Sequence, residues 1–248
     1  MRILVTGAAG RVGQAVRKEL AAAGHRLRLV DIRPVKNPEG ESQVADITDP
    51  STVRKIMKGI EAVVHLAYGR ISGNPADCIV QGYDVNAKAT HLLLWAAAEA
   101  RVKRFIFTSS LSVFGKGDLL LRRKTMDERS VPHPGEPYGF TKLLGEEACR
   151  FAARSYGLSV IVLRLCYVRN PTEWKKVRRY RPRSLFQKRG RAMATHVDDV
   201  ARSIHRALKV RHRGFELFHI AAENSGRITS IRRSQKELGF HPQHRIDR

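Results

Sequence analysis

Cysteine is scarce in this chain, and long apolar runs are missing. Only three cysteines occur, Cys78, Cys149 and Cys166. An odd number at wide spacing fits neither a disulfide framework nor a set of metal ligands, so we predict free thiols in a reducing cytoplasm. No apolar run approaches the roughly 20 residues of a membrane helix, and we expect no membrane partner. The N-terminus enters a strand-like run at once, so we expect no secretory signal.

Acidic residues are few beside the basic ones. The chain has 46 Lys and Arg against 23 Asp and Glu, a net charge of +23, and ten of the basic residues fall within 169–191. Such an excess fits a nucleic acid, a membrane surface, an anionic substrate or a solvated basic surface. Neither zinc-finger spacing nor an aromatic RNA-binding motif accompanies the charge, so we do not favour nucleic acid as a partner.

Short apolar segments alternate with helix-length segments over the first two-thirds of the chain. Strands that are apolar throughout and separated by helices pair in parallel with both faces covered. We therefore predict an α/β fold, a Rossmann-type doubly wound parallel sheet with a small C-terminal substrate lobe. The predicted strands are 3–7, 27–31, 43–46, 62–67, 104–110, 158–166 and 215–222. The predicted helices are 11–24, 50–59, 75–101 as one long or broken helix, 138–156, one from about 196, and 228–239 ended by Gly239.

The alternation weakens after residue 168. Residues 169–193 are basic and contain Pro171 and Pro182, so we expect a loop-rich segment there. We predict a dinucleotide-binding domain with the catalytic residues over 1–168. A reduced substrate-binding lobe over 169–248 is expected to interleave with the last sheet elements.

Three glycines mark the first strand-to-helix junction, TGAAGRVG at 6–13. Gly7 permits the tight turn, Gly10 lets the backbone approach a pyrophosphate, and Gly13 lets the helix pack closely on the sheet. The phosphates would sit at the positive end of the helix that begins near Arg11. The junction therefore predicts dinucleotide binding.

Asp31 ends the second predicted strand and selects between cofactors. Its carboxylate accepts hydrogen bonds from the ribose hydroxyls of NAD and repels the 2′-phosphate of NADP. Arg33 and Arg11 could each approach a 2′-phosphate, but we expect NAD, with NADP less favoured. Asp46, at the end of the third predicted strand, has two interpretations: a contact to the adenine, or a turn aspartate.

The segment YGFTK puts Tyr138 and Lys142 one helical turn apart on the same face. A free tyrosine titrates near 10, so a base at neutral pH needs its pKa lowered by about three, or ~4 kcal/mol. A nearby ammonium and a positive nicotinamide ring both favour the phenolate. Ser109 and Ser110 end a buried strand, at the edge where ligands bind in such folds. Ser109 has two interpretations: a contact to the ligand at this edge, or local hydrogen bonding to the backbone.

These motifs together carry a family resemblance over about residues 1–205. The sequence resembles the extended short-chain dehydrogenase/reductases, the NAD-dependent epimerase/dehydratase family. The resemblance rests on TGAAGRVG, Asp31, HLA at 65–67, Asn86, FTSS followed by SVFG, YGFTK and HVDDVA.

The resemblance implies a role for each site residue. Ser110 would polarise the substrate oxygen, Tyr138 would be the acid/base, and Lys142 would hold the nicotinamide ribose and tune Tyr138. Asn86 would support the site, and the segment 165–168 would lie against the nicotinamide carboxamide. The predicted cofactor-binding residues are Gly7, Gly10, Arg11, Val12, Gly13, Asp31, Asp46, Ile47, Leu66, Ala67, Tyr138, Lys142 and Cys166.

The chain is short for this family, and its basic segment 169–191 matches no pattern of the family from which residue roles could be assigned. Its short length and the segment LGFHP at 238–242 resemble the compact uronate dehydrogenases. We expect oxidation of a secondary hydroxyl on a sugar-like, anionic substrate, a uronate or a nucleotide sugar, with Arg169 and Arg178 as candidate contacts. The sequence does not decide between a dehydrogenase and an epimerase reaction. A homodimer is a further possibility. The alternatives are a non-catalytic NAD(P)-sensing regulator and, less favoured, a nucleic-acid-binding protein.

Three other features have competing interpretations. Cys166 could contact the cofactor or be a buried apolar residue. We interpret His65 as a packed strand histidine whose backbone lies near the adenosine. His196 with Asp198 and Asp199 (HVDD) could suggest a metal, but we predict a capped helix start, with Thr195 or an aspartate as the cap, and assign no metal.

Overall fold

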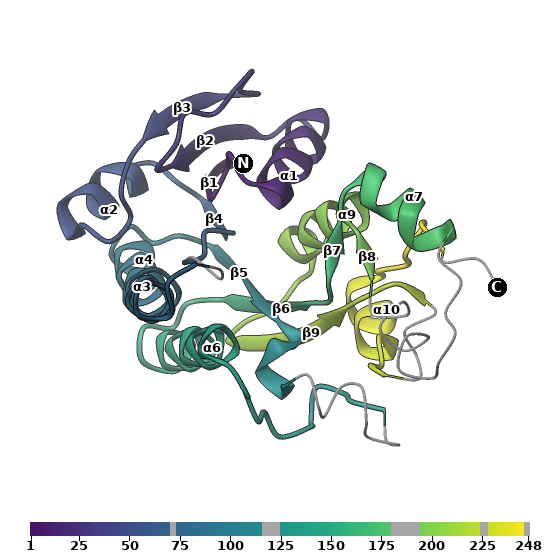
Figure 1. The fold of residues 1–248 in the computed structure, drawn as a ribbon. Helices are drawn as coiled ribbons and strands as arrows, with labels where there is room; N and C mark the ends of the chain where they lie inside the picture. Colours follow the sequence, from purple (N-terminus) through teal and green to yellow (C-terminus); the bar gives the residue numbers. More distant parts are fainter. Residues whose placement is uncertain (70–72, 116–124, 180–193, 224–227, 246–248) are drawn as a thin grey trace.

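The structure, a computed structural model, describes residues 1–69, 73–115, 125–179, 194–223 and 228–245. A seven-stranded sheet in the order β3-β2-β1-β4-β5-β6-β9 forms its centre, and every neighbouring pair is parallel (Figure 1). The strands are β1 Arg2–Thr6, β2 Arg26–Asp31, β3 Glu41–Val44, β4 Ala62–His65, β5 Arg104–Ser110, β6 Val160–Leu165 and β9 Phe215–Ile220. A separate parallel pair is formed by β7 Val168–Arg169 and β8 Thr195–His196.

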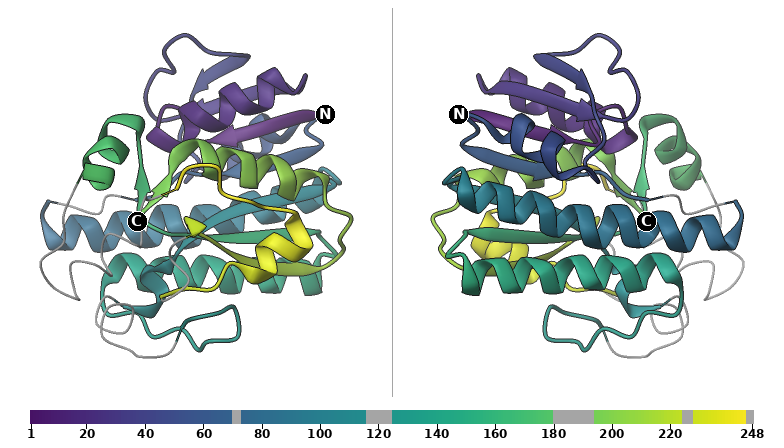
Figure 2. Two further views of the ribbon diagram at one scale, coloured as in Figure 1. Left: turned by 90° about the vertical axis from the view of Figure 1, so that its right-hand side faces the viewer. Right: turned by 90° about the vertical axis from the view of Figure 1, so that its left-hand side faces the viewer.

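Helices cover both faces of the sheet, as Figure 2 shows. Side chains alternate along each strand, so in β5 Phe105 and Phe107 enter one core and Ile106 enters the other. The first core is closed by α2 Pro50–Met57, α4 Thr90–Glu99 and α6 Pro137–Ser155, and the second by α1 Arg11–Ala22, α9 Val197–Lys209 and α10 Arg232–Leu238. The prediction of a doubly wound α/β fold is confirmed.

Two predicted boundaries need correction. The helix predicted over 228–239 is shorter, because α10 begins only at Arg232. The third strand is Glu41–Val44, two residues earlier than the predicted 43–46. The segment 75–101, predicted as one long or broken helix, consists of three helical pieces: α3 Pro75–Gln81, a π-helical segment η1 Gly82–Ala89, and α4. Within the stretch expected to be irregular, a short 3₁₀ helix η2 occupies Leu111–Phe114.

The prediction that 169–193 is loop-rich is wrong over its first part, because α7 spans Pro171–Arg179. Asn170 and Glu173 form a reciprocal capping box at its start. The Glu173 amide donates to Asn170 Oδ1 at 2.8 Å, and the Asn170 amide donates to a Glu173 carboxylate oxygen at 3.1 Å. Pro171 stands in the first turn, where proline is well tolerated. Residues 180–193 lie outside the described part of the chain.

The C-terminal third is not a separate layer. Its strand β9 completes the main sheet beside β6, while α9 packs against α1 on one face. Gly239 ends α10 in the left-handed conformation, with φ of 62°, as predicted. The boundary at residue 168 stays a prediction. Among the described residues, no helix is both long and apolar enough to cross a membrane.

Candidate active site

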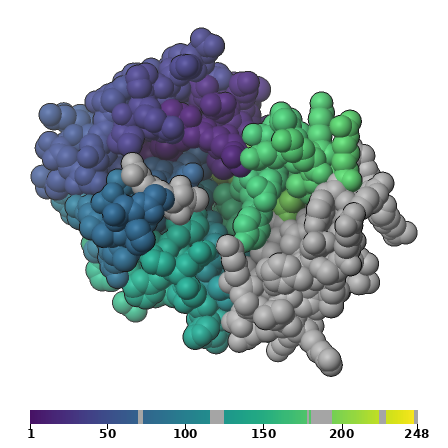
Figure 3. All heavy atoms as spheres, viewed as in Figure 1, coloured from purple at the N-terminus to yellow at the C-terminus, as the bar shows by residue number. Residues whose placement is uncertain are grey.

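The order of the sheet reverses between β1 and β4, so their following segments diverge to opposite faces. In open α/β sheets, ligands bind at the carboxyl ends of the strands beside such a switch point. In Figure 3 the surface is hollowed here, between α1 and α7 on one side and α3 and α6 on the other. The predicted cofactor and catalytic residues lie on the segments that reach this edge.

The glycine junction fits a pyrophosphate. Gly7 has φ of +72°, and a Cβ there would lie 2.6 Å from the Ala67 amide nitrogen; a Cβ on Gly13 would lie 2.4 Å from the Gly7 carbonyl oxygen. The junction therefore tolerates no side chain at either position. Helix α1 begins after Gly10 without a side-chain cap. Its first N–H groups are therefore free to receive an anion.

Asp31 is buried at the end of β2 and is fixed against the glycine junction. One carboxylate oxygen accepts the Ala9 amide at 3.0 Å, and the other accepts the Arg33 amide at 3.1 Å and Arg33 Nε at 3.4 Å. Arg33 is thus held on Asp31 itself. This arrangement fits recognition of the ribose hydroxyls of NAD.

Two other polar residues of the predicted cofactor set are engaged elsewhere. Arg11 donates to Glu173 at 2.9 Å and to the Val168 carbonyl oxygen at 2.9 Å, so its side chain turns toward α7. Asp46 lies two residues beyond β3 and not at its end as expected. Its carboxylate accepts the Thr48 amide at 2.8 Å, a local turn contact.

The apolar residues of the predicted set line the same edge or lie just beneath it. Val12 packs on the α1 side of the core, and Leu66 and Ala67 follow β4 directly under the glycine junction. Ile47 is buried in the opposite core. Cys166 is fully buried beyond β6. It packs as a buried apolar residue, which is one of the two interpretations drawn from the sequence.

Ser110 and Tyr138 meet where β5 ends and α6 begins. Ser110 Oγ donates a hydrogen bond to Ser112 Oγ at 3.1 Å and caps η2 by accepting the Ser112 amide at 3.1 Å. Burial, and then the neighbouring Tyr68, raise the pKa of Tyr138, and the nearby Ser110 hydroxyl opposes them. The ring of Tyr68 stands edge-on to Tyr138 at 6.2 Å between centroids.

Lys142 lies one turn farther along α6 and is only 2% exposed. Its Nζ donates to the Thr108 carbonyl oxygen at 3.0 Å and lies 4.8 Å above the Phe107 ring. Burial lowers the pKa of Lys142 to about 7, while Cys149 and Glu146 favour the charged form. The ammonium is therefore easily lost near neutral pH in this environment.

Asn86 is buried within the π-helical segment and braces α6. Its amide nitrogen donates to Thr141 Oγ1 at 3.0 Å, and its Oδ1 accepts the Gly69 amide at 3.3 Å. The predicted supporting role fits this position. His65 is also packed as predicted, with its ring bonded to Thr6 Oγ1 at 2.7 Å and Thr90 Oγ1 at 2.9 Å.

A buried ionic cluster beneath the site was not predicted. Glu146 accepts hydrogen bonds from Ser109 Oγ at 2.6 Å, from Arg164 Nε at 2.8 Å and from Arg164 Nη2 at 2.7 Å. Ser109 therefore bonds a carboxylate and not the backbone, which corrects its alternative interpretation. Two signals pointed to this cluster. Glu146 follows Lys142 by four residues on one helix face, and Arg164 interrupts an otherwise apolar strand.

The two predicted substrate arginines differ in what the structure describes. Arg169 lies in β7, with its guanidinium 5.8 Å from the Tyr167 ring centroid. Its Nε is buried and makes no hydrogen bond within the described residues. The side chain of Arg178 lies outside the described part of the molecule.

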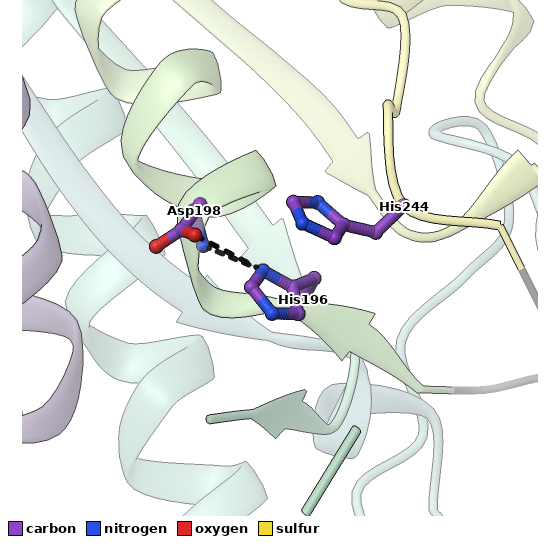
Figure 4. Close-up of side chains that lie close together, drawn as sticks. All are labelled: His196, Asp198 and His244. Atoms are coloured by element: carbon purple, nitrogen blue, oxygen red, sulfur yellow. Dashed lines mark hydrogen bonds and ion pairs between the residues drawn. The ribbon is translucent and has the colours of Figure 1, made fainter. Parts of the chain in front are cut away.

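His196, Asp198 and His244 lie close together at the start of α9 (Figure 4). The cap of α9 is His196, whose Nδ1 accepts the Asp198 amide at 3.2 Å, so the predicted caps, Thr195 or an aspartate, were wrong. The His196 and His244 rings stack with centroids 3.5 Å apart and planes within 12°. Arg202 also reaches His244 Nδ1 at 3.4 Å. Two stacked imidazole rings beside the Arg202 guanidinium fit a structural contact better than a metal site. The assignment of no metal stays a prediction.

The glycine junction at the carboxyl edge of a doubly wound parallel sheet is typical of dinucleotide-binding proteins of the α/β class. The model of the NAD-dependent epimerase/dehydratase family matches residues 3–221. The chain therefore belongs to this family. The predictions of the family, of an NAD-dependent enzyme and of its fold are confirmed.

Individual relatives agree with this assignment. The NAD-dependent glucose-6-phosphate dehydrogenase of Haloferax volcanii is 29% identical over 97% of this chain and 92% of that protein. The uronate dehydrogenase of Pseudomonas syringae pv. tomato is 33% identical over 66% of this chain and 58% of that protein. A short-chain dehydrogenase/reductase from Agrobacterium tumefaciens, solved with bound NAD, superposes with a TM-score of 0.83 at 26% identity, covering 100% of this chain and 94% of that one.

Proposed function

We propose that this protein is an NAD-dependent dehydrogenase that oxidises a secondary hydroxyl of an anionic sugar at Ser110, Tyr138 and Lys142. The observation that carries the proposal is the meeting of Ser110, at the end of β5, with Tyr138, in the first turn of α6, at the carboxyl edge of the sheet. This placement would allow both hydroxyl groups to reach one substrate oxygen. When bound, NAD supplies the hydride acceptor.

Each of the three residues has a distinct task. Tyr138 Oη takes the proton of the substrate hydroxyl, and Ser110 Oγ donates a hydrogen bond to the oxygen as it becomes a carbonyl. When it carries its proton, Lys142 would stabilise the phenolate form of Tyr138 electrostatically and donate to the ribose. Ser110→Ala should lower kcat by about 10²–10³-fold, the usual effect of losing one such donor. Unchanged turnover in that variant would contradict the assignment.

Oxidation with release of product is favoured over epimerisation. The two Haloferax volcanii relatives named as sugar dehydrogenases, one for glucose 6-phosphate and one for L-arabinose, align with this chain over 92% and 96% of their lengths. We therefore favour a free sugar acid or sugar phosphate as the substrate.

Arg169 is the group best suited to the anionic part of the substrate. It follows β6 and the buried Cys166, and its partly unpaired guanidinium presents donors in a planar fork that matches carboxylate or phosphate. Formation of NADH should be compared for glucuronate, glucose 6-phosphate, glucose and UDP-glucose. We expect kcat/KM for one of the two charged sugars to exceed that for glucose, with salt reducing the difference. Equal values for all of them would refute anionic selectivity.

We also propose that two copies associate through the exposed face of η1 and α6. Tyr83 and Phe140 are about half exposed and lie 6.4 Å apart, and the exposed Phe151 and Tyr156 lie 5.3 Å apart. Exposed aromatic pairs on one helical face are typical of protein interfaces. Light scattering should give the mass of a dimer, and Phe151→Glu should give a monomer. A monomeric unmodified protein would refute this proposal.

A cytoplasmic location is proposed on the chain's three free cysteines, of which Cys149 and Cys166 are buried. Fractionation of cells that express the protein tests it.

A further inference from the structure

A second hollow lies at the opposite edge of the sheet from the candidate active site. It has a volume of about 600 Å³ and is formed by the start of β5, the end of α9 and the segment 210–213 that leads toward β9. Strand β5 runs from Arg104 to Ser110, so the hollow is roughly 20 Å from the catalytic serine. In Figure 2 this edge is the side at which the chain begins, away from α7.

Lysine and arginine are the most frequent residues in the lining of this hollow, beside apolar ones. Five of its nine lining residues are lysine or arginine, and none is acidic: Lys103, Arg104, Lys209, Arg211 and Arg213. Lys103 is paired with Glu61 at 3.1 Å. Within the described part of the chain, Lys209, Arg211 and Arg213 are exposed and form no ion pair. Three exposed cations without ion pairs therefore line one concavity.

The hollow is also built on a fixed backbone. Arg104 donates to the Val210 carbonyl oxygen at 2.8 Å and to the His212 carbonyl oxygen at 3.3 Å, and Ser159 Oγ donates to the same His212 oxygen at 3.0 Å. Arg104 thereby occupies the backbone carbonyl oxygens that follow α9. These oxygens are then not available to attract the exposed cations. Arg104 Nε is buried and has no partner within the described residues.

We propose that this hollow binds a multiply charged, phosphate-bearing small molecule. Its volume falls in the range of small-ligand sites, and its clustered guanidinium groups match phosphate oxygens in charge and geometry. The exposed Lys209 supplies a further point charge. The site is separate from the glycine junction and gives a role to part of the excess of basic residues.

Inorganic tripolyphosphate is the probe, and calorimetry of the full chain saturated with NAD measures its binding. Saturation keeps the probe out of the glycine junction. The test variant is Lys209→Ala/Arg211→Ala/Arg213→Ala, and the matched control is Lys18→Ala/Lys55→Ala/Lys236→Ala, which removes the same charge from exposed sites without ion pairs. We expect the test variant to bind tripolyphosphate about tenfold or more weakly and the control to bind it like the unmodified protein.

Equal losses in both variants, or no binding by the unmodified protein, would overturn the proposal. A short DNA duplex is titrated in parallel, because its backbone carries the same phosphate chemistry. Duplex binding that the test variant loses, without binding of tripolyphosphate, would assign the surface to a nucleic acid and also overturn the proposal. NADH formation by the test variant should be unchanged, since none of its three residues lies at the catalytic edge.

Discussion

Replacing Glu146 by leucine leaves the guanidinium of Arg164 charged and unpaired inside the protein. Glu146 is fully buried and Arg164 is 1% exposed, so water cannot take over the lost contacts. The change removes the 2.8 Å and 2.7 Å bonds to Arg164 and the 2.6 Å bond from Ser109. Breaking one side of a buried pair costs about 3–5 kcal/mol. Arg164→Met should cost a similar amount, because the carboxylate then loses its counter-ion.

The double variant Glu146→Leu/Arg164→Met should recover most of this loss. Both charges are then gone, and apolar side chains of similar size fill the space beside Phe114, whose ring lies 4.9 Å from the Arg164 guanidinium. Buried ion pairs replaced by apolar residues are often neutral or stabilising. The Ser109 hydroxyl still loses its acceptor, which costs about 1–3 kcal/mol. The double variant should therefore be less damaged than either single variant.

Thermal and urea unfolding of the four proteins completes a double-mutant cycle. For a chain of this size about 1 kcal/mol shifts Tm by roughly 2–4 °C, so each single variant should melt roughly 6–20 °C lower. The coupling free energy should be several kcal/mol and favourable. Single-variant losses below about 1 kcal/mol, or a double variant as unstable as the sum of both, would refute the idea that the pair is desolvated and interdependent.

Three further predictions concern the site. Asp31→Ala should narrow the preference for NAD over NADP, because the ribose hydroxyls of NAD lose their acceptor and the 2′-phosphate of NADP is no longer repelled by a carboxylate. Calorimetry with both cofactors measures the two affinities. Tighter NADP binding by the unmodified protein would contradict the prediction. Tyr138→Phe should abolish NADH formation with NAD affinity nearly unchanged, and substantial turnover would contradict it. Lys142 has its pKa lowered to about 7, so the unfolded chain holds the proton up to about 10.5 and the stability of the unmodified protein should rise with pH between these values. Lys142→Met should thus raise Tm most at pH 7 and below, an advantage that shrinks toward pH 10; a constant difference would contradict it.

The sheet and the glycine junction could be predicted because their signals are local. Strands that are apolar throughout need both faces covered, and glycines at 7, 10 and 13 follow such a strand directly. Helix α7 was missed because its basic composition and prolines suggested a loop. The reciprocal contacts of Asn170 and Glu173 reveal a capping box that the sequence already contained as Asn-x-x-Glu.

Contacts between distant segments were harder to predict. The Glu146–Arg164 pair joins α6 to β6, and no local pattern says which of several acidic residues meets a buried arginine. The π-helical turn at η1 was missed for a related reason. It places Asn86 against Thr141 of another helix, a contact between distant segments that no local pattern signals.

The two titratable groups of the catalytic helix are both pushed toward their neutral forms. Burial raises the pKa of Tyr138 and lowers that of Lys142 to about 7, so the phenolate and the ammonium expected from the sequence do not form by proximity alone. Glu146 favours the charged form of Lys142, but the same carboxylate also accepts a hydrogen bond from Arg164. A further positive charge beside Tyr138 is needed to favour its phenolate, and the oxidised nicotinamide ring carries one. We therefore expect proton removal at Tyr138 to depend on cofactor binding.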